Sequence, residues 1–398
     1  MSDTTVVRNA RLPQRSGLYQ ISIEEGVVSA ILQRNGDTIA SMTPSPSSLD
    51  SATTVIDVAK DWISLGAVDL QINGALGLAF PDLRLSDVEK LNEICMLLWQ
   101  QGVAEFCPTV VTTSIDNVHG CLAALQAHQR RRSLPGQAHI IGAHLEGPFL
   151  NAAKRGAHPA ECLQPLTMAT IQKVIGDFAD VVSIMTLAPE VAEDSGVIEW
   201  LTQQGIVVSL GHSLATAEQA GRAFDQGATM VTHAFNAMPG LHHREPGLLA
   251  AALIDARVCS GFIADGQHIC PIMLDVLLRA GRGSRDAWMG GLFLVSDALS
   301  PLGLPDGIYP WDSREIEVIK GTARLADGTL SGTTLPLIAG AQNLVKWGLC
   351  GVEDAIALVT KAPRDAIGLP RFAVGNPAQL IRWCQNDAGQ LTWRWLDI

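Results

Sequence analysis

The sequence has 398 residues, of which 47% are hydrophobic and 17% are charged, and its formal net charge at pH 7 is −12. A composition this apolar is typical of a folded globular protein and excludes an intrinsically disordered chain. Acidic residues outnumber basic ones by 40 to 28, which argues against a nucleic-acid-binding surface and against binding to an anionic membrane. We therefore expect no nucleic-acid or membrane partner, although a local basic pocket for one phosphate group would not show in the total.

The chain carries no recognisable targeting or redox motif. Its first residues, MSDTTVVRNARLPQ, lack the apolar stretch of a secretory signal, and no later stretch approaches the length of a membrane span, about 18 uncharged apolar residues. The eight cysteines include no C-x-x-C pair, so neither a zinc knuckle nor a dithiol redox motif is visible. We expect reduced, mostly buried thiols and a cytoplasmic protein.

Residues 1–61 have the pattern of β-structure. The stretch GLYQISIEEGVVSAIL at 17–32 contains the alternation of a half-buried strand, and the Asn-Gly pair at 35–36 is typical of a hairpin turn. A Pro- and Ser-rich link, TPSPSSLDS, follows at 43–51. We interpret this region as the N-terminal part of a small β domain.

From residue 62 the chain repeats one rhythm, in which a short apolar, β-branched run is followed by a longer stretch with helical spacing. The eight runs begin at residues 62, 104, 139, 181, 205, 228, 258 and 291. Amphipathic helices are expected between them, for example at 85–102, 114–130 and 215–227. Eight strand-helix units predict an α/β fold with a (β/α)8 TIM barrel over residues 62–371, and no G-x-G-x-x-G follows a run to indicate a dinucleotide-binding sheet.

The tail, residues 372–398, returns to the alternating pattern around an Asp-Ala-Gly turn at 387–389. We expect this segment to join residues 1–61, so that both chain ends form one small β-sandwich domain beside the catalytic barrel. The alternative is two unrelated additions to the barrel.

Polar side chains gather at the ends of the eight runs, and in a (β/α)8 barrel these ends form the face that carries catalytic groups. In chain order they are Asp69, Gln71 and Asn73; Thr112 and Thr113; His144 and Glu146; Glu190; His212; His233 and Asn236; Asp265 and His268; and Asp297. A lone carboxylate such as Glu146 more often caps a helix or bonds a loop. Histidines and carboxylates that converge from separate strands are harder to explain by packing.

Glu146, His212 and His233 supply one oxygen and two nitrogens, the ligand set that suits Zn²⁺ or Fe²⁺ with one position left open for water. Asp297, in LVSDA, would face the same barrel mouth. A carboxylate beside a metal-activated water fits a general base that later returns the proton to a leaving group. The residues thus predict one divalent metal per subunit, zinc with iron as the alternative.

These motifs resemble, in order, those of the N-acetylglucosamine-6-phosphate deacetylases of the amidohydrolase superfamily. The stretches that carry the resemblance lie within roughly residues 62–370 and are HLEGPFLNAAKRGAH at 144, LAPE at 187, GHSLATAEQA at 211, THAFNAM at 232, REPGLLAAAL at 244, ADGQH at 264, LVSDA at 294 and DGTLSG at 327. The resemblance implies deacetylation of N-acetylglucosamine 6-phosphate to glucosamine 6-phosphate and acetate, in amino-sugar catabolism.

The resemblance implies the same three metal ligands and makes Asp297 both the acid and the base. His158 would contact the substrate carbonyl and stabilise the oxyanion. The substrate-binding residues that it implies are Ala157, His158, Asn236, Ala237, Arg244, His268, Leu330, Ser331 and Gly332. Arg244 would bind the 6-phosphate, and it resembles a family arginine that reaches across from a neighbouring subunit, which implies a homodimer or homotetramer.

Some positions depart from the pattern of related proteins. Many amidohydrolases carry H-x-H after the first barrel strand, whereas this chain has Gln71 and Asn73 there. Neutral amides are poor zinc ligands beside imidazole, so we expect one tightly bound metal. His242 and His243 stand beside the expected phosphate site, where members of the family tend to have a short loop with small residues. Cys107, at the end of the second run, is expected to be a buried thiol rather than a neighbour of the metal.

Two alternative functions follow from the same residues. One is a related amidohydrolase that acts on N-acetylgalactosamine 6-phosphate or another N-acyl substrate, since the loops at a barrel mouth change specificity. The other is a non-catalytic sugar-phosphate sensor. The complete set of metal ligands together with Asp297 argues against the sensor, because a binding protein has no use for a base beside a metal.

Overall fold

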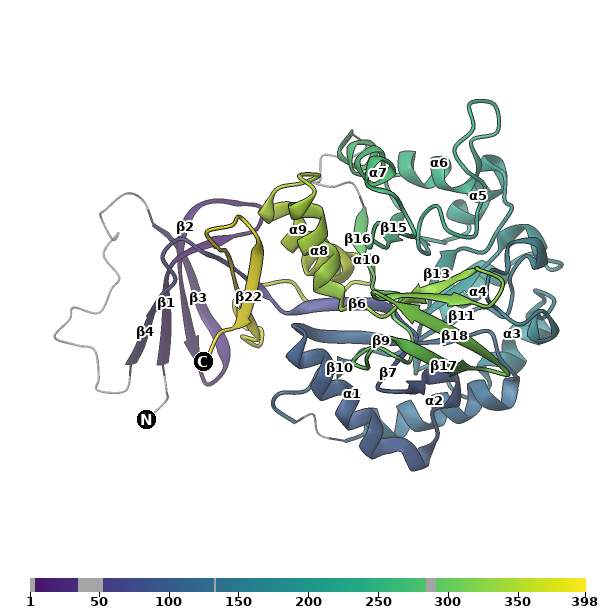
Figure 1. Ribbon diagram of the computed structural model, residues 1–398, viewed down its shortest axis with the longest axis horizontal. Coiled ribbons are helices and arrows are strands. Elements are labelled where there is room, and N and C mark those ends of the chain that lie inside the picture. Colours follow the sequence, from purple (N-terminus) through teal and green to yellow (C-terminus); the bar gives the residue numbers. More distant parts are fainter. Residues whose placement is uncertain (1–3, 35–52, 132–133, 284–290) are drawn as a thin grey trace.

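The computed structural model describes residues 4–34, 53–131, 134–283 and 291–398. It consists of a barrel and, beside it, a small β domain built from both ends of the chain (Figure 1). The expected Asn-Gly turn at 35–36 and the Pro- and Ser-rich link at 43–51 lie outside the described residues. Among the described helices, none is both long and apolar enough to cross a membrane.

Parallel strands form the predicted barrel, one from each apolar run. Within the described residues the barrel strands are β6 (Ala67–Ile72), β9 (Val103–Val111), β11 (Ala143–Glu146), β12 (Val182–Leu187), β13 (Val207–Leu210), β14 (Met230–Val231), β15 (Cys259–Phe262) and β16 (Leu292–Leu294). A short strand, β10 (His139–Ile140), pairs with β9. The barrel closes between β16 and β6, where the Asn73 N–H donates to the Ala298 carbonyl at 2.7 Å and the Asp297 N–H donates to the Gln71 carbonyl at 2.9 Å. The (β/α)8 barrel is therefore confirmed.

Helices follow the barrel strands and pack around them (Figure 1). They are α1 (Val88–Gln100), α2 (Ile115–Gln129), α3 (Met168–Ile175), α4 (Val197–Gln203), α5 (Ala217–Asp225), α6 (Gly247–Ile254), α7 (Pro271–Gly283), α8 (Leu337–Lys346), α9 (Val352–Val359) and α10 (Lys361–Ala366). The helices expected at 85–102, 114–130 and 215–227 are α1, α2 and α5. The start of α5 is fixed by a capping box, in which the Thr216 hydroxyl accepts from the Gln219 N–H and the Gln219 side chain accepts from the Thr216 N–H.

Both chain ends share one small β domain. Its strands are β1 (Thr4–Leu12), β2 (Arg15–Glu24), β3 (Val27–Arg34), β4 (Thr53–Asp57), β5 (Trp62–Leu65), β21 (Leu380–Gln385) and β22 (Leu391–Trp395). Strand β1 belongs to two layers, because it pairs with β2 and β4 along most of its length and with β5 at its end, and β5 continues through β21 to β22. Val7, Ile21, Ile63 and Leu380 are buried in a core that is common to both layers. The predicted β-sandwich from both chain ends is thus confirmed.

The apolar run that begins at residue 62 is divided between the two parts of the molecule. Residues 62–65 pair with β21 in the small domain, and only residues 67–72 enter the barrel. Gly66 lies at the crossing, where a Cβ atom would come within 2.6 Å of the Trp395 ring. A glycine is required there because the backbone passes so close to the neighbouring ring. The division of the chain at 61/62 and 371/372 stays a prediction.

A tryptophan pair joins the small domain to the barrel. The ring of Trp395 on β22 stacks on the ring of Trp99 on α1, with centroids 3.9 Å apart and planes inclined by 6°. The Trp395 Nε1–H also donates to the Trp99 carbonyl at 2.7 Å. The stacked area and the satisfied indole N–H stabilise the contact between the two parts.

A separate antiparallel sheet follows the last barrel strand and was not predicted. Its strands are β17 (Gly307–Trp311), β18 (Arg314–Ile319), β19 (Thr322–Leu325) and β20 (Leu330–Thr333). Trp311, Ile316 and Val318 form its small core together with Leu299. The turn between β18 and β19 is Lys320-Gly321, and both residues have positive φ angles, 50° and 80°. This is the two-residue turn that suits the twist of a hairpin.

Candidate active site

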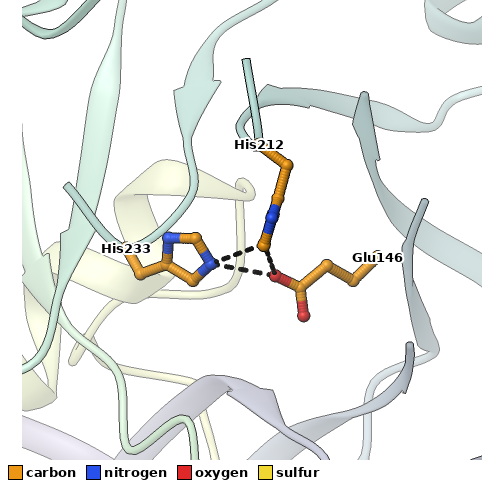
Figure 2. Close-up of side chains that lie close together, drawn as sticks. All are labelled: Glu146, His212 and His233. Carbon is orange, nitrogen blue, oxygen red and sulfur yellow. Dashed lines mark hydrogen bonds and ion pairs between the residues drawn. The ribbon is translucent and has the colours of Figure 1, made fainter. Parts of the chain in front are cut away.

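Three side chains of the type that bind metals converge at the mouth of the barrel (Figure 2). The Oε1 atom of Glu146 lies 3.1 Å from His212 Nε2 and 3.0 Å from His233 Nε2, and the two nitrogens are 3.0 Å apart. Glu146 is the last residue of β11, and His212 and His233 each lie two residues after the ends of β13 and β14. None of the three is more than 5% exposed. The three residues predicted as metal ligands are thus brought together in one buried group.

The ring of His212 is oriented so that its Nε2 atom faces the other two potential ligands. Its Nδ1 lies 2.9 Å from the Lys154 carbonyl oxygen, which can only accept a hydrogen bond. Nδ1 therefore carries a proton, and Nε2 is the nitrogen that remains to bind a metal ion. This Nε2 atom faces a carboxylate oxygen and a second imidazole nitrogen among buried side chains. The donor set of two nitrogens and one oxygen suits a divalent cation between them.

The backbone is strained at the strand ends that carry these groups. His212, His233 and Asp297 have φ angles of 49°, 27° and 47°. Residues other than glycine rarely adopt positive φ, and strain of this kind collects at functional sites. The positive φ angle turns the backbone sharply after each short strand. The side chains of His212, His233 and Asp297 thereby enter the mouth of the barrel.

Asp297 lies beside the candidate metal site and has one oxygen already engaged. Its Oδ1 accepts hydrogen bonds from Asn73 Nδ2 at 2.8 Å and from Gln71 Nε2 at 3.3 Å. Gln71 Nε2 also donates to Glu146 Oε1 at 3.1 Å. Burial, together with the charge of Glu146, raises the pKa of Asp297 to about 6. The two amides that replace the H-x-H pair therefore hold the carboxylates in place, and they leave Oδ2 of Asp297 without a partner among the described residues.

His158 approaches the same group with its ring fixed by Thr112. The Nδ1 atom lies 3.3 Å from the Thr112 backbone nitrogen and 2.9 Å from its hydroxyl oxygen. A backbone N–H can only donate, so Nδ1 accepts and the proton of the neutral ring is on Nε2, 4.0 Å from Glu146 Oε1. Burial, followed by the charge of His212, lowers the pKa of His158 to about 3, which keeps the ring neutral. A neutral N–H in this position can donate to a carbonyl oxygen of a bound substrate.

These groups line a cavity of about 710 Å³. Its volume lies within the range of about 300 to 1,000 Å³ that is usual for small-molecule sites. Residues from many parts of the chain complete the wall, including Lys154, Ala157, Asn236, Ala237, His268, Leu330 and Ser331. The cavity therefore joins the potential metal ligands and Asp297 to a space that can hold one small molecule.

The chain is similar to sugar-phosphate deacetylases over most of its length. The N-acetylglucosamine-6-phosphate deacetylase of Bos taurus is 36% identical over 314 residues, which cover 77% of this chain and 74% of that protein. This chain belongs to the N-acetylglucosamine-6-phosphate deacetylase family.

Other comparisons agree with this deacetylase family. The N-acetylgalactosamine-6-phosphate deacetylase of Escherichia coli O157:H7 is 32% identical over 371 residues, which cover 92% of this chain and 90% of that protein. A solved structure with a TM-score of 0.80 is a mutant of N-acetyl-D-glucosamine-6-phosphate deacetylase from Mycobacterium smegmatis in complex with N-acetyl-D-glucosamine-6-phosphate. It has 25% sequence identity, and the match covers 98% of this chain and 97% of that one.

No protein-family model matches the chain.

Most residues that the deacetylase resemblance implied for substrate binding lie in the cavity wall, namely Ala157, His158, Asn236, Ala237, His268, Leu330 and Ser331. His268 is oriented by Asp265, because its Nδ1 lies 2.7 Å from Asp265 Oδ2 and its backbone N–H donates to Oδ1 at 2.9 Å. Asn236 Nδ2 donates to the His233 carbonyl at 3.2 Å. The roles of these residues toward a substrate stay predictions.

Gly332 and Arg244 do not line the cavity. Gly332 lies close to the backbone of Asp297, where a Cβ atom would come within 2.7 Å of the Asp297 carbonyl oxygen. Arg244 is exposed, and its Nη1 lies 2.9 Å from His243 Nε2. A single chain therefore does not place Arg244 near its own metal ligands.

Two of the other polar residues at strand ends serve the scaffold. The His144 Nδ1–H donates to the Leu70 carbonyl at 3.0 Å, and its Nε2 accepts from the Thr186 hydroxyl at 2.7 Å, below the metal ligands. Glu190 accepts from the Ser213 hydroxyl at 2.6 Å and ties a neighbouring loop to β12. Both are satisfied by protein partners, so neither is available to a ligand.

Sequence reasoning missed one part of the wall. Trp311, the last residue of β17, and the turn residues Asp312 and Ser313 also line the cavity. The signal was the alternation in REIEVI next to the Lys320-Gly321 turn, which reads as a hairpin. Cys107 is fully buried, and burial raises the pKa of its thiol, as expected of a core residue.

Proposed function

We propose that this protein is a metal-dependent hydrolase that converts N-acetylglucosamine 6-phosphate to glucosamine 6-phosphate and acetate, in amino-sugar catabolism. The observation that carries the proposal is one cavity in which three potential metal ligands, Asp297 and His158 lie together. The relatives are named as deacetylases of 6-phosphorylated N-acetyl amino sugars, which supports the same reaction class for this chain.

Zinc is the proposed cofactor, one ion per subunit, with iron as the alternative. Glu146, His212 and His233 would hold it, as their donor set favours either ion. When bound, the ion supplies a Lewis acid that lowers the pKa of water and polarises an acyl carbonyl. The side-chain amide N–H groups of Gln71 and Asn73 donate to Glu146 and Asp297, respectively. Their use in these hydrogen bonds supports one tightly bound metal ion.

Asp297 is proposed to carry out both proton transfers. Its free Oδ2 takes a proton from the attacking water, and the water oxygen forms the new bond to the acetyl carbon. As the carbon–nitrogen bond breaks, the same oxygen gives the proton to the leaving nitrogen. Acetate and the free amine are the two products. The Nε2–H of His158 donates to the oxyanion that develops on the carbonyl oxygen.

Asn236, Ala237 and His268, together with Leu330 and Ser331 of β20, are proposed to hold the sugar. Arg244 is proposed to bind the 6-phosphate in the cavity of a neighbouring subunit, in a homodimer or homotetramer. Its exposure, away from the cavity of its own chain, supports this arrangement. Paired guanidinium hydrogen bonds suit a phosphate.

A second candidate substrate is N-acetylgalactosamine 6-phosphate. The relative that carries this substrate in its name matches over 92% of the chain. The two sugars differ only in the configuration of one hydroxyl group, so the cavity wall rather than the metal site would separate them.

Acetate release by the purified, metal-loaded protein tests the proposal. The substrates are N-acetylglucosamine and N-acetylgalactosamine, each with and without the 6-phosphate, and Asp297→Asn serves as the inactive control. We expect the highest kcat/KM for N-acetylglucosamine 6-phosphate and one equivalent of metal per chain. Absence of acetate from all four sugars would refute the proposal, and tight binding without turnover would then favour the sensor.

A further inference from the structure

The β17–β20 sheet is attached at one end to the segment that carries Asp297. The backbone N–H of Thr333, the last residue of β20, donates to the Asp297 carbonyl at 3.0 Å, and the Thr333 carbonyl accepts from the Leu299 N–H at 2.9 Å. The Thr333 hydroxyl donates to the Ser296 carbonyl at 2.8 Å. Thr333 is only 1% exposed, so these bonds are shielded from water. The backbone on either side of Asp297 is therefore hydrogen-bonded to this sheet.

The other end of the sheet is hydrogen-bonded to the segment that carries His158. Arg314, the first residue of β18, donates from Nη2 to the Ala157 carbonyl at 2.6 Å. The guanidinium is held in that direction by Asp312, since its Nε donates to Asp312 Oδ1 at 3.0 Å and its Nη2 to Oδ2 at 2.5 Å. Ala157 directly precedes His158, so this contact acts one peptide unit from the imidazole.

The segment around His158 depends on such contacts because it is irregular. Residues 151–163 contain only two short 3₁₀ turns, at Ala152–Lys154 and Ala160–Cys162. Within the segment, the His158 N–H donates to the Arg155 carbonyl at 3.1 Å. A loop without a regular backbone ladder is easily displaced, and a shift of about 1 Å in a catalytic group can lower a rate by about 100-fold.

We propose that Arg314 is a positioning residue that fixes His158 relative to Asp297, with the β17–β20 sheet as the rigid brace between them. This inference rests on the proposed function for its kinetic consequences. Arg314 does not itself line the cavity, whereas its partner Asp312 does. Its charge is paired with Asp312 and its Nη2 is used by Ala157, which makes it unsuited to bind a phosphate directly.

Hydrogen exchange of the metal-loaded protein tests the brace without reference to turnover. Arg314→Ala should speed amide exchange in peptides that cover residues 152–163 by roughly 10-fold to 100-fold, the range that follows from losing one hydrogen bond to a charged donor. Arg324→Ala is the matched control, because Arg324 is an exposed arginine of the same sheet that donates to the Gly328 carbonyl within its own hairpin. Unchanged exchange in Arg314→Ala, or the same change in the control, would overturn the inference.

Kinetics supply the second measurement. Arg314→Ala should lower kcat by roughly 10-fold to 100-fold with little change in KM, equally for the phosphorylated and the unphosphorylated sugar. Arg314→Lys should recover part of the loss, and Arg324→Ala should keep the wild-type kcat. A rise in KM confined to the 6-phosphate would overturn the inference and make Arg314 a phosphate ligand. If the wild-type protein turns over none of the sugars, the proposed function fails, and the exchange experiment alone decides whether Arg314 holds the loop.

Discussion

Asp297→Asn should abolish most catalysis while it leaves the site otherwise intact. The carbonyl oxygen of the new amide can accept the hydrogen bonds that Asp297 Oδ1 accepts from Asn73 and Gln71. The amide cannot accept the proton of water, so turnover should fall by roughly 10² to 10⁴, the range for loss of a general acid-base group. Because Asp297 is not one of the three ligand-type residues, metal content should stay at the wild-type level.

The same substitution should stabilise the metal-free protein. Burial and the charge of Glu146 raise the pKa of Asp297 from 3.8 to about 6, so the folded state prefers the protonated carboxyl more strongly than the unfolded state does. As pH rises from about 4 to about 6, the wild-type protein therefore loses stability at this residue, and the full penalty is present above that range. A shift of about 2 pKa units corresponds to about 3 kcal/mol. Asparagine has no charge to bury and avoids this cost.

Urea unfolding of the two metal-free proteins, at several values between pH 4 and pH 8, measures the difference. The advantage of Asp297→Asn should grow across this range to about 3 kcal/mol and should shrink when metal is added, because a cation stabilises the ionised carboxylate. A constant difference across the range would refute the burial argument. Turnover of Asp297→Asn close to that of the wild type would show that the base lies elsewhere.

Three further substitutions test other residues of the site. Glu146→Gln replaces an anionic ligand by a neutral amide and should lose most of the bound metal with an unchanged circular dichroism spectrum, whereas full metal content would return Glu146 to a capping role. His158→Gln should lower kcat by roughly 10² to 10³, as loss of an oxyanion donor does, and a loss seen mainly in KM would contradict this role. Arg244→Ala should lower kcat/KM for a 6-phosphorylated sugar by roughly 10-fold to 200-fold and barely affect the unphosphorylated sugar. Mixing Arg244→Ala chains with Asp297→Asn chains should restore activity if Arg244 acts across an interface, and no recovery despite proven subunit exchange would place it in its own chain's cavity.

The barrel could be predicted because its strands are buried on both faces and therefore read as continuous apolar runs. Strand β12, VSIMTL, is such a run, and LAPE follows directly where the strand ends. The same regularity located the proposed metal ligands, since Glu146, His212 and His233 each follow a run and the ends of parallel strands meet at one face. Side chains far apart in the sequence could thus be grouped without knowledge of their distances.

Other features depend on contacts that no local pattern contains. The positive φ of His212 belongs to a residue type that seldom adopts it, and only the surrounding structure imposes it. The run at 62–72 is divided because Trp62–Leu65 find a partner strand near the C-terminus. In the sequence, the alternating pattern around Arg314 predicts only an exposed charge on a strand. Its hydrogen bond to the Ala157 carbonyl joins residues that are 157 positions apart. The position of Arg244 in an assembly requires a second chain.

The pairing of β5 with β21 has a consequence for the newly made chain. Ile63 and Leu65 of β5 are buried in the finished protein. One edge of β5 pairs with β1, where Trp62 lies opposite Arg11, but the other edge has no partner until the C-terminal hairpin with β21 has been synthesised. Translation proceeds at about 5 to 20 residues per second, so this interval lasts about 15 to 60 s. During that time an unpaired strand edge beside apolar side chains is open to association with other chains. A chain that ends before β21 would keep every residue of the cavity and would still be expected to aggregate on the ribosome or soon after release.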